Sequence, residues 1–359
     1  MKGLFVSDCE GPISKNDNAY ELATKFIPNG DKLFCNISKY DDVLADVFNK
    51  PDYTAGSTLQ LILPFLKAYD ITNQQMEDFS ADNIILIEET QTTLKHIQSI
   101  AKCYIVSTSY EHYIKALCRA IDFPYENTYC TKVSLDKIDI ISQEKEVLRE
   151  RAQEISQMPL ITIPANAKSL TDFSLKDQAL IKRFDEIFWR EILYMSAGKF
   201  FREVVTVGGE QKAESIRDIV NRLKVPFEDV MYVGDSITDV EALSLVRDNG
   251  GLAVSFNGNS YAVKSADVAV VSENNFVTAI IADVFYRFGR ERTLKVIKSW
   301  GKTVLEGAGV DFGLLKQLFE SSEREPKVQI VTSENMNSIV TESSAFRKKV
   351  RGVAVGRLG

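Results

Sequence analysis

Short apolar runs that end in polar residues recur along the chain and predict the strands of a parallel sheet. The first run, residues 4–7, stops at Asp8-Cys9-Glu10-Gly11-Pro12. Similar runs follow at 103–106, 128–133, 230–233, 252–255 and 268–271. Continuous apolar runs of this kind are typical of strands that are buried on both faces. Helical patterns lie between several of them, so the sequence predicts an α/β fold with a doubly wound parallel sheet.

Two stretches interrupt this alternation. Residues 16–86 carry apolar side chains at three- and four-residue spacing, which predicts a helical cap between the first two strands. Residues 136–203 predict a second, mainly helical insertion. The expected core then consists of 1–15, 87–135 and 204–289, and residues 290–359 are expected to form a helical extension and tail. The basic end, Arg347 to Arg357, is interpreted as a solvated tail.

Polar residues that can take part in catalysis or ligand binding follow the predicted strands. Asp8 and Glu10 follow the first strand, where the carboxyl ends of parallel strands commonly bind ligands. Side chains alternate along an extended chain, so both carboxylates can point into one cleft. Ser107 follows 103–106, Lys212 lies near a predicted helix start, and Asp235 and Asp239 follow 230–233.

These four pieces, in this order, resemble the haloacid dehalogenase-like superfamily. The segment 251–271 is also similar to the strand-turn-strand that follows the fourth motif in many of its phosphatases. The resemblance covers roughly residues 1–15, 100–135 and 204–285, and the helical cap resembles the phosphoserine-phosphatase branch. It implies a Rossmann-like core and a Mg²⁺-dependent phosphatase that acts on a small phosphorylated metabolite through an aspartyl-phosphate. The insertion at 136–203 departs from the phosphoserine pattern and puts serine phosphate in doubt.

A carboxylate nucleophile splits phosphate-ester hydrolysis into two easier displacements, and Asp8 is the candidate. A Mg²⁺ ion is expected to offset its repulsion from phosphate. Asp8 and Asp235 are the expected side-chain ligands, and the resemblance adds the backbone carbonyl of Glu10. Asp239 is expected either to bind through water or to hold the other ligands in place.

Lys212 and Ser107 are expected to bind the phosphoryl group, since fixed donors stabilise its negative oxygens. Thr108 is included in this phosphate-binding set. Thr108 and Ser109 are also alternatives to Ser107 as the hydroxyl that binds the phosphoryl group. The alternatives are a solvated lysine for Lys212 and a plain helix cap for Ser107.

Glu10 departs from the superfamily pattern, in which most phosphatases carry aspartate. We expect it to act as general acid and then general base, with a reach longer by one methylene. A minority of branches with D-x-E-G, including enolase-phosphatase-like members, are similar here. The alternative is that Glu10 marks a protein with altered or weakened turnover.

Composition narrows the possible partners, metal sites and cellular locations. The net charge of −7 and the lack of a basic stripe exclude nucleic acid as a first choice of partner. Five cysteines without a CxxC pair, together with only two histidines, exclude a zinc site and fit a reducing compartment. No apolar run approaches the length of a membrane span. The expected location is the cytoplasm.

Two alternatives to a phosphatase stay open. One is a phosphotransferase that passes the phosphoryl group to an alcohol. The other is a catalytically weak accessory subunit, whose partner would bind through the 136–203 insertion or the C-terminal extension. The pattern also resembles archaeal superfamily members described as subunit R of the energy-converting hydrogenase A, themselves predicted phosphatases.

Overall fold

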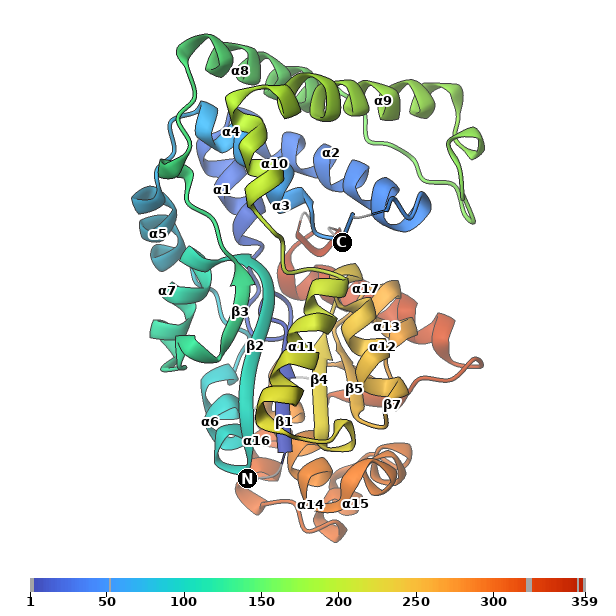
Figure 1. The fold of residues 1–359 in the computed structure, drawn as a ribbon. Helices are drawn as coiled ribbons and strands as arrows, with labels where there is room; N and C mark the ends of the chain where they lie inside the picture. The colour runs from blue at the N-terminus through green and yellow to red at the C-terminus, as the bar shows by residue number, and fades with distance from the viewer. Residues whose placement is uncertain (1–2, 52, 321–324, 354, 358–359) are drawn as a thin grey trace.

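A mainly parallel sheet forms the lower part of the molecule, and a helical body lies above it (Figure 1). The structure is a computed structural model that describes residues 3–51, 53–320, 325–353 and 355–357. Within these residues no helix has both the length and the apolar character that a membrane crossing requires.

The sheet of the described residues has seven strands in the order β3-β2-β1-β4-β5-β6-β7. The strands are β1 (Gly3–Ser7), β2 (Ala101–Tyr110), β3 (Thr128–Thr131), β4 (Val230–Gly234), β5 (Leu252–Phe256), β6 (Val268–Val271) and β7 (Lys327–Ile330). Strands β1 to β6 pair in parallel, whereas β7 runs antiparallel to β6. The predicted doubly wound α/β fold is confirmed, but β7 was not predicted, because the C-terminal region was expected to be helix and tail.

Alternating side chains of β1 anchor a helical layer on each face of the sheet. Leu4 and Val6 pack with the helices α11 (Glu210–Leu223) and α12 (Val240–Asp248). Phe5 points the other way and joins a second apolar cluster. That cluster includes residues of α6 (Thr90–Ile100), α7 (Glu111–Ile121) and α14 (Phe276–Lys298). Burial on both faces explains why the strand reads as a continuous apolar run.

The two predicted insertions share one hydrophobic core. The first supplies α1 (Asn18–Phe26), α2 (Gly30–Asp42), a π-helical turn (Val43–Val47), α3 (Thr58–Leu61), α4 (Leu63–Ala68) and α5 (Asn73–Asp82). The second supplies α8 (Ser142–Gln157), α9 (Leu175–Glu186) and α10 (Phe200–Glu203). Tyr40 of α2 stacks on Phe184 of α9, with ring centroids 4.9 Å apart. We call the body that these helices form above the sheet the cap (Figure 1).

Three local elements differ from the sequence prediction. Strand β2 does not stop at Val106 but continues to Tyr110, with an irregular register between Ser107 and Tyr110 against β3. Helix α11 begins at Glu210, whereas the apolar spacing predicts a start at Glu214, so Lys212 lies within the first turn instead of before the helix. A short helix, α13 (Ser260–Ser265), lies between β5 and β6, where the sequence indicated a simple turn.

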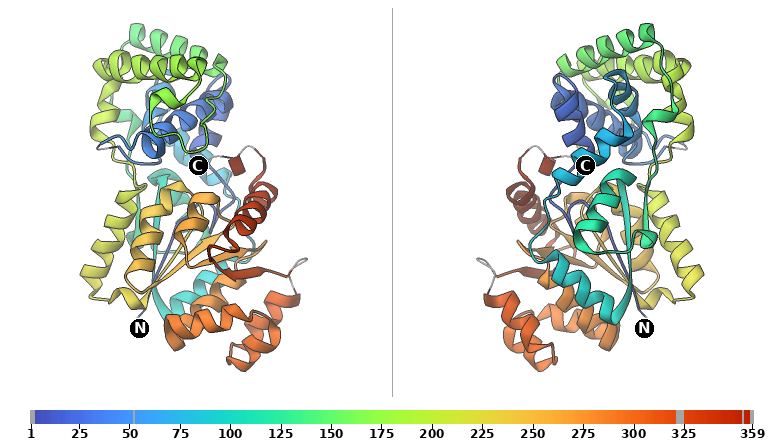
Figure 2. Two further views of the ribbon diagram at one scale, coloured as in Figure 1. Left: turned by 90° about the vertical axis from the view of Figure 1, so that its right-hand side faces the viewer. Right: turned by 90° about the vertical axis from the view of Figure 1, so that its left-hand side faces the viewer.

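The C-terminal region packs against the sheet instead of extending into solvent. It contains α15 (Lys302–Gly307), α16 (Phe312–Glu320), β7 and α17 (Met336–Arg351). On α17, Ile339 packs with Val263 of α13 and Ala269 of β6, and Ser343 Oγ donates a hydrogen bond of 2.7 Å to the carbonyl of Gly258. In Figure 2, α17 (dark red) lies beside the sheet, below the level of the cap. The interpretation of Arg347 to Arg357 as a solvated tail is wrong, because Arg347 is only 3% exposed.

Candidate active site

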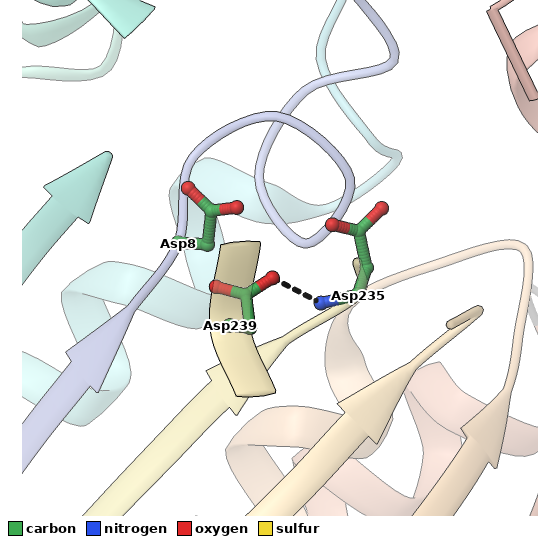
Figure 3. A group of neighbouring side chains, drawn as sticks. All are labelled: Asp8, Asp235 and Asp239. Atoms are coloured by element: carbon green, nitrogen blue, oxygen red, sulfur yellow. Dashed lines mark hydrogen bonds between the residues drawn. The ribbon is translucent and has the colours of Figure 1, made fainter. Parts of the chain in front are cut away.

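Two aspartates lie at the point where the chain order of the sheet reverses. Asp8 follows β1, Asp235 follows the neighbouring β4, and the Asp8 N–H donates to the Val233 carbonyl over 2.8 Å. Asp239 lies one short turn further, at the end of a 3₁₀ segment (Ile237–Asp239). One carboxylate oxygen of each aspartate lies within 4.8 Å of the other two, and all three are buried (Figure 3). The convergence of Asp8, Asp235 and Asp239 follows from strand ends that share one sheet edge.

Lys212 is fully buried beneath these carboxylates. Its Nζ lies 2.9 Å from Asp8 Oδ2 and 2.7 Å from Asp239 Oδ1. Burial lowers the pKa of Lys212, but the charges of Asp239 and then Asp8 outweigh this effect and raise the pKa above its ordinary value. The ammonium group therefore stays charged, and it fixes the orientation of Asp8.

Asp239 holds the site together through both carboxylate oxygens. Its Oδ1 accepts hydrogen bonds from Lys212 Nζ and from Tyr232 Oη, the latter over 2.6 Å. Its Oδ2 accepts the N–H groups of Asp235 and Ser236 over 2.9 and 3.0 Å. Of the two expected roles for Asp239, this arrangement favours the one in which it holds other ligands in place.

Asp8 is oriented by its own backbone as well as by Lys212. Its Oδ1 accepts the Cys9 N–H over 2.6 Å, and the residue is 5% exposed. Burial raises the pKa of Asp8 to about 6, and Lys212 counteracts part of this increase. At neutral pH the carboxylate is mainly ionised, as a nucleophile requires.

Glu10 links the catalytic loop to the cap. Its Oε1 accepts the N–H of Asn18, the first residue of α1, over 2.6 Å. Burial, followed by the charge of Asp17, raises the pKa of Glu10 well above its usual range. A carboxyl group with a raised pKa retains its proton at higher pH and is suited to donate it to a leaving group.

The structure separates the two expected hydroxyl donors. Ser107 Oγ donates to Ser109 Oγ over 3.1 Å and accepts the Ser109 N–H over 3.2 Å. Ser107 and Thr108 both line the cavity beside Asp8, but the buried Oγ1 of Thr108 has no hydrogen-bond partner among the described residues. An unpaired buried hydroxyl is costly unless a ligand satisfies it. Thr108 is therefore the better placed of the two to bind an anionic oxygen.

The donor set around the cavity fits a small divalent cation. Asp8 and Asp235 offer oxygens, which are the ligands that Mg²⁺ prefers. Asp239 Oδ1 and Oδ2 already accept several hydrogen bonds. Asp8 and Asp235 are therefore better suited than Asp239 to bind the cation directly. The part expected for the Glu10 backbone carbonyl stays a prediction.

The profile of a protein family described as haloacid dehalogenase-like hydrolase matches residues 60–283, which is more than half of the chain. The chain belongs to this family. No curated protein matches it. A solved gene product from Archaeoglobus fulgidus, AF1437, is 26% identical and has a TM-score of 0.80, over 100% of this chain and 99% of that one.

Two further solved structures are more distantly similar to this hydrolase. A phosphoserine phosphatase, solved as an analogue of its phospho-aspartyl intermediate, is 14% identical with a TM-score of 0.46, over 75% of this chain and 92% of that one. A hydrolase from Salmonella enterica is 12% identical with a TM-score of 0.42, over 71% and 62% of the two chains. The resemblance to hydrogenase subunit R stays a prediction.

The cap closes over the site of the hydrolase. Thr54 Oγ1 donates to the Gly208 carbonyl over 2.9 Å, and Tyr110 Oη donates to the Leu59 carbonyl over 2.5 Å. The cavity that remains has a volume of about 90 Å³. Ligand pockets usually measure roughly 300–1,000 Å³, so this closed form leaves room for only a small group.

Two site residues were missed by the sequence analysis. Arg347 Nη1 contacts Asp235 Oδ2, and Arg351 Nη1 lies 3.2 Å from the same oxygen. The signal that could have found them is their spacing of four, which puts both on one face of a helix. Because they occur in a basic run near the end of the sequence, that spacing was not separated from the pattern of a solvated tail.

Proposed function

We propose that this hydrolase is a Mg²⁺-dependent phosphatase that cleaves a small phosphate monoester through an aspartyl-phosphate at Asp8. The observation that carries the proposal is the contact of Asp8 Oδ2 with Lys212 Nζ, 2.9 Å apart, within a buried group of three aspartates. That contact holds an ionised carboxylate in one orientation beside a site that suits a cation. Bound Mg²⁺ would neutralise charge on the phosphoryl oxygens and would be held by Asp8 and Asp235.

In the first step, an Asp8 oxygen attacks phosphorus while the ester P–O bond breaks. Glu10 gives its proton to the leaving oxygen, which departs as an alcohol. Thr108 donates a hydrogen bond to a phosphoryl oxygen, and Lys212 keeps Asp8 aligned. Preorganised donors of this kind stabilise the charge of the transition state without reorganising.

In the second step, the deprotonated Glu10 accepts a proton from water as the water oxygen attacks phosphorus. The bond from phosphorus to the Asp8 oxygen breaks, and inorganic phosphate is released. Glu10 ends protonated and Asp8 ends ionised, so the site returns to its starting state. The closed cap supports this sequence, because it limits access of bulk water to the aspartyl-phosphate.

The test is phosphate release from an aryl phosphate by wild-type protein and by Asp8→Asn, with Mg²⁺ and with a chelator. We expect release only from wild type with Mg²⁺. A matched control is Asp229→Asn, which lies in the 3₁₀ turn before β4, at the opposite end of that strand from Asp235. Equal rates in wild type and Asp8→Asn would overturn the proposal.

A further inference from the structure

Helix α17 brings two buried cations to the candidate active site from outside the matched family region. Residues 60–283 carry the family match, whereas α17 covers Met336–Arg351. Arg347 and Arg351 are buried, with side chains 3% and 6% exposed. Both contact Asp235, which is also an expected metal ligand.

The cavity has a strongly acidic lining. It is formed in part by six acids, which are Asp8, Glu10, Asp17, Asp41, Asp42 and Asp235. Among the described residues that line it, Arg347 and Arg351 are the cationic side chains. Lys212 lies below the carboxylates and has two of them as its partners. An anionic substrate that enters this cavity therefore meets protein cations only on α17.

Contacts other than those of the arginines also hold α17 in place. Strand β7, which precedes the helix, pairs with β6. Ser343 Oγ donates a hydrogen bond to the Gly258 carbonyl over 2.7 Å, and Ile339 packs with Val263 and Ala269. These contacts anchor the helix, whereas a purely structural pair of buried guanidinium groups would add a large desolvation cost.

Counting the charges that are linked by ion pairs shows what the arginines can balance. The carboxylates of Asp8, Asp235 and Asp239 form ion pairs with three cations. The cations are Lys212, Arg347 and Arg351, so the charges of this set cancel. When Asp235 serves a divalent cation, two positive charges are in excess. A phosphate monoester carries about −2 at neutral pH and restores the balance.

We propose that Arg347 and Arg351 are substrate-binding residues, which bind the phosphoryl oxygens of a dianionic phosphate monoester. In the structure both guanidinium groups contact Asp235 Oδ2. The planar guanidinium group matches phosphoryl oxygens with two parallel hydrogen bonds. This inference rests on the proposed function and adds that the substrate site is completed by the C-terminal helix.

The test is calorimetric titration of the full chain with inorganic phosphate in the presence of Mg²⁺, which needs no turnover. The variants are Arg347→Gln, Arg351→Gln and Arg347→Lys, and Lys349→Gln is the matched control on the same helix. Loss of a hydrogen bond to a charged group predicts roughly tenfold or greater weakening of phosphate binding for each glutamine variant. Arg347→Lys is expected to bind with intermediate affinity, and the control is expected to bind like wild type.

A titration with Mg²⁺ alone separates the proposal from its main rival. If Arg347→Gln binds phosphate as tightly as wild type but binds Mg²⁺ more tightly, the arginines only compete with the metal at Asp235, and the inference is wrong. Thermal unfolding of each variant shows whether it is folded, and Arg347→Lys retains the charge if the glutamine variant is not.

The same data distinguish this inference from the proposed function. If wild type releases phosphate from esters but the glutamine variants bind phosphate normally, only the inference fails. If phosphate binding depends on the arginines but no ester is cleaved, only the proposed function fails. A wild-type protein that neither binds phosphate with Mg²⁺ nor cleaves esters contradicts both.

Discussion

The ammonium group of Lys212 lies 2.7 Å from Asp239 Oδ1, and neither side chain is exposed to solvent. A buried ion pair of this kind depends on both partners, because removal of one leaves the other charge without compensation. The pair also fixes Asp8, through the second contact of Lys212. Stability and catalytic geometry are therefore coupled at this point.

Asp239→Asn is expected to lower the free energy of unfolding by about 3–5 kcal/mol, because it breaks a buried ion pair. Urea unfolding followed by circular dichroism measures the loss. Tyr232→Phe is the matched control, since it removes one hydrogen bond to the same carboxylate and should cost only about 1 kcal/mol. Equal losses of unfolding free energy in the two variants would show that the ion pair stabilises the fold no more than the single hydrogen bond does.

Glu10→Gln is expected to slow hydrolysis of an alkyl phosphate by about 10²–10⁴-fold, because an alkoxide leaves poorly without a proton. Hydrolysis of an aryl phosphate with an acidic phenol should fall much less. Initial rates with the two esters measure the contrast. Glu10→Asp retains the carboxyl group at shorter reach and should keep part of the activity. An equal loss on both esters would assign Glu10 a role other than general acid.

Gly11→Ala is expected to abolish metal binding. Gly11 has φ +118°, and a Cβ there would collide with the Asp235 carboxylate. Gly289→Ala is the matched control, because its φ is +75° but nothing lies within 4 Å of the added Cβ. Both variants should pay about 1–3 kcal/mol of backbone strain, and only Gly11→Ala should lose the heat of Mg²⁺ binding in calorimetry. Normal Mg²⁺ binding by Gly11→Ala would contradict the expected role of Asp235.

The raised pKa of the buried Asp41 carboxyl predicts that the stability of the fold depends on pH. Burial raises its pKa from 3.8 to about 6, although Thr58 donates two hydrogen bonds to Oδ2. The folded protein therefore binds this proton more tightly than the unfolded chain, and the associated stability is lost as pH rises from about 4 to about 6. Over this window Asp41→Asn should gain stability relative to wild type, as measured by urea unfolding at successive pH values. A difference that does not change with pH would be contrary to this assignment.

Most of the sheet and the meeting of the aspartates could be predicted, because both depend on local patterns. A short apolar run followed by Asp8, and a second followed by Asp235, are sufficient once the strands are parallel, since their ends share an edge. The shared core of the cap could not be predicted in this way. It depends on contacts such as Tyr40 with Phe184, which join residues far apart in the chain.

The features of the site that the sequence did not resolve have a similar cause. Ser107 and Thr108 are neighbours in an irregular part of β2, and only the three-dimensional course of that segment decides which hydroxyl is left without a hydrogen-bond partner beside the cavity. Arg347 is part of a basic helix whose other side packs on β6 and α13. The sequence shows the charge of that helix but not the surface that receives it.

The contact of Arg351 with Lys15, in the segment between β1 and α1, has a consequence for the order in which parts of the protein form. Arg351 Nε donates to the Lys15 carbonyl over 3.2 Å, and these residues are 336 positions apart in the chain. During synthesis, Asp8 emerges from the ribosome well before α17. The contact between Arg351 and Lys15 can therefore form only after α17 has been synthesised, so this side of the candidate site is completed later than the loop that carries Asp8.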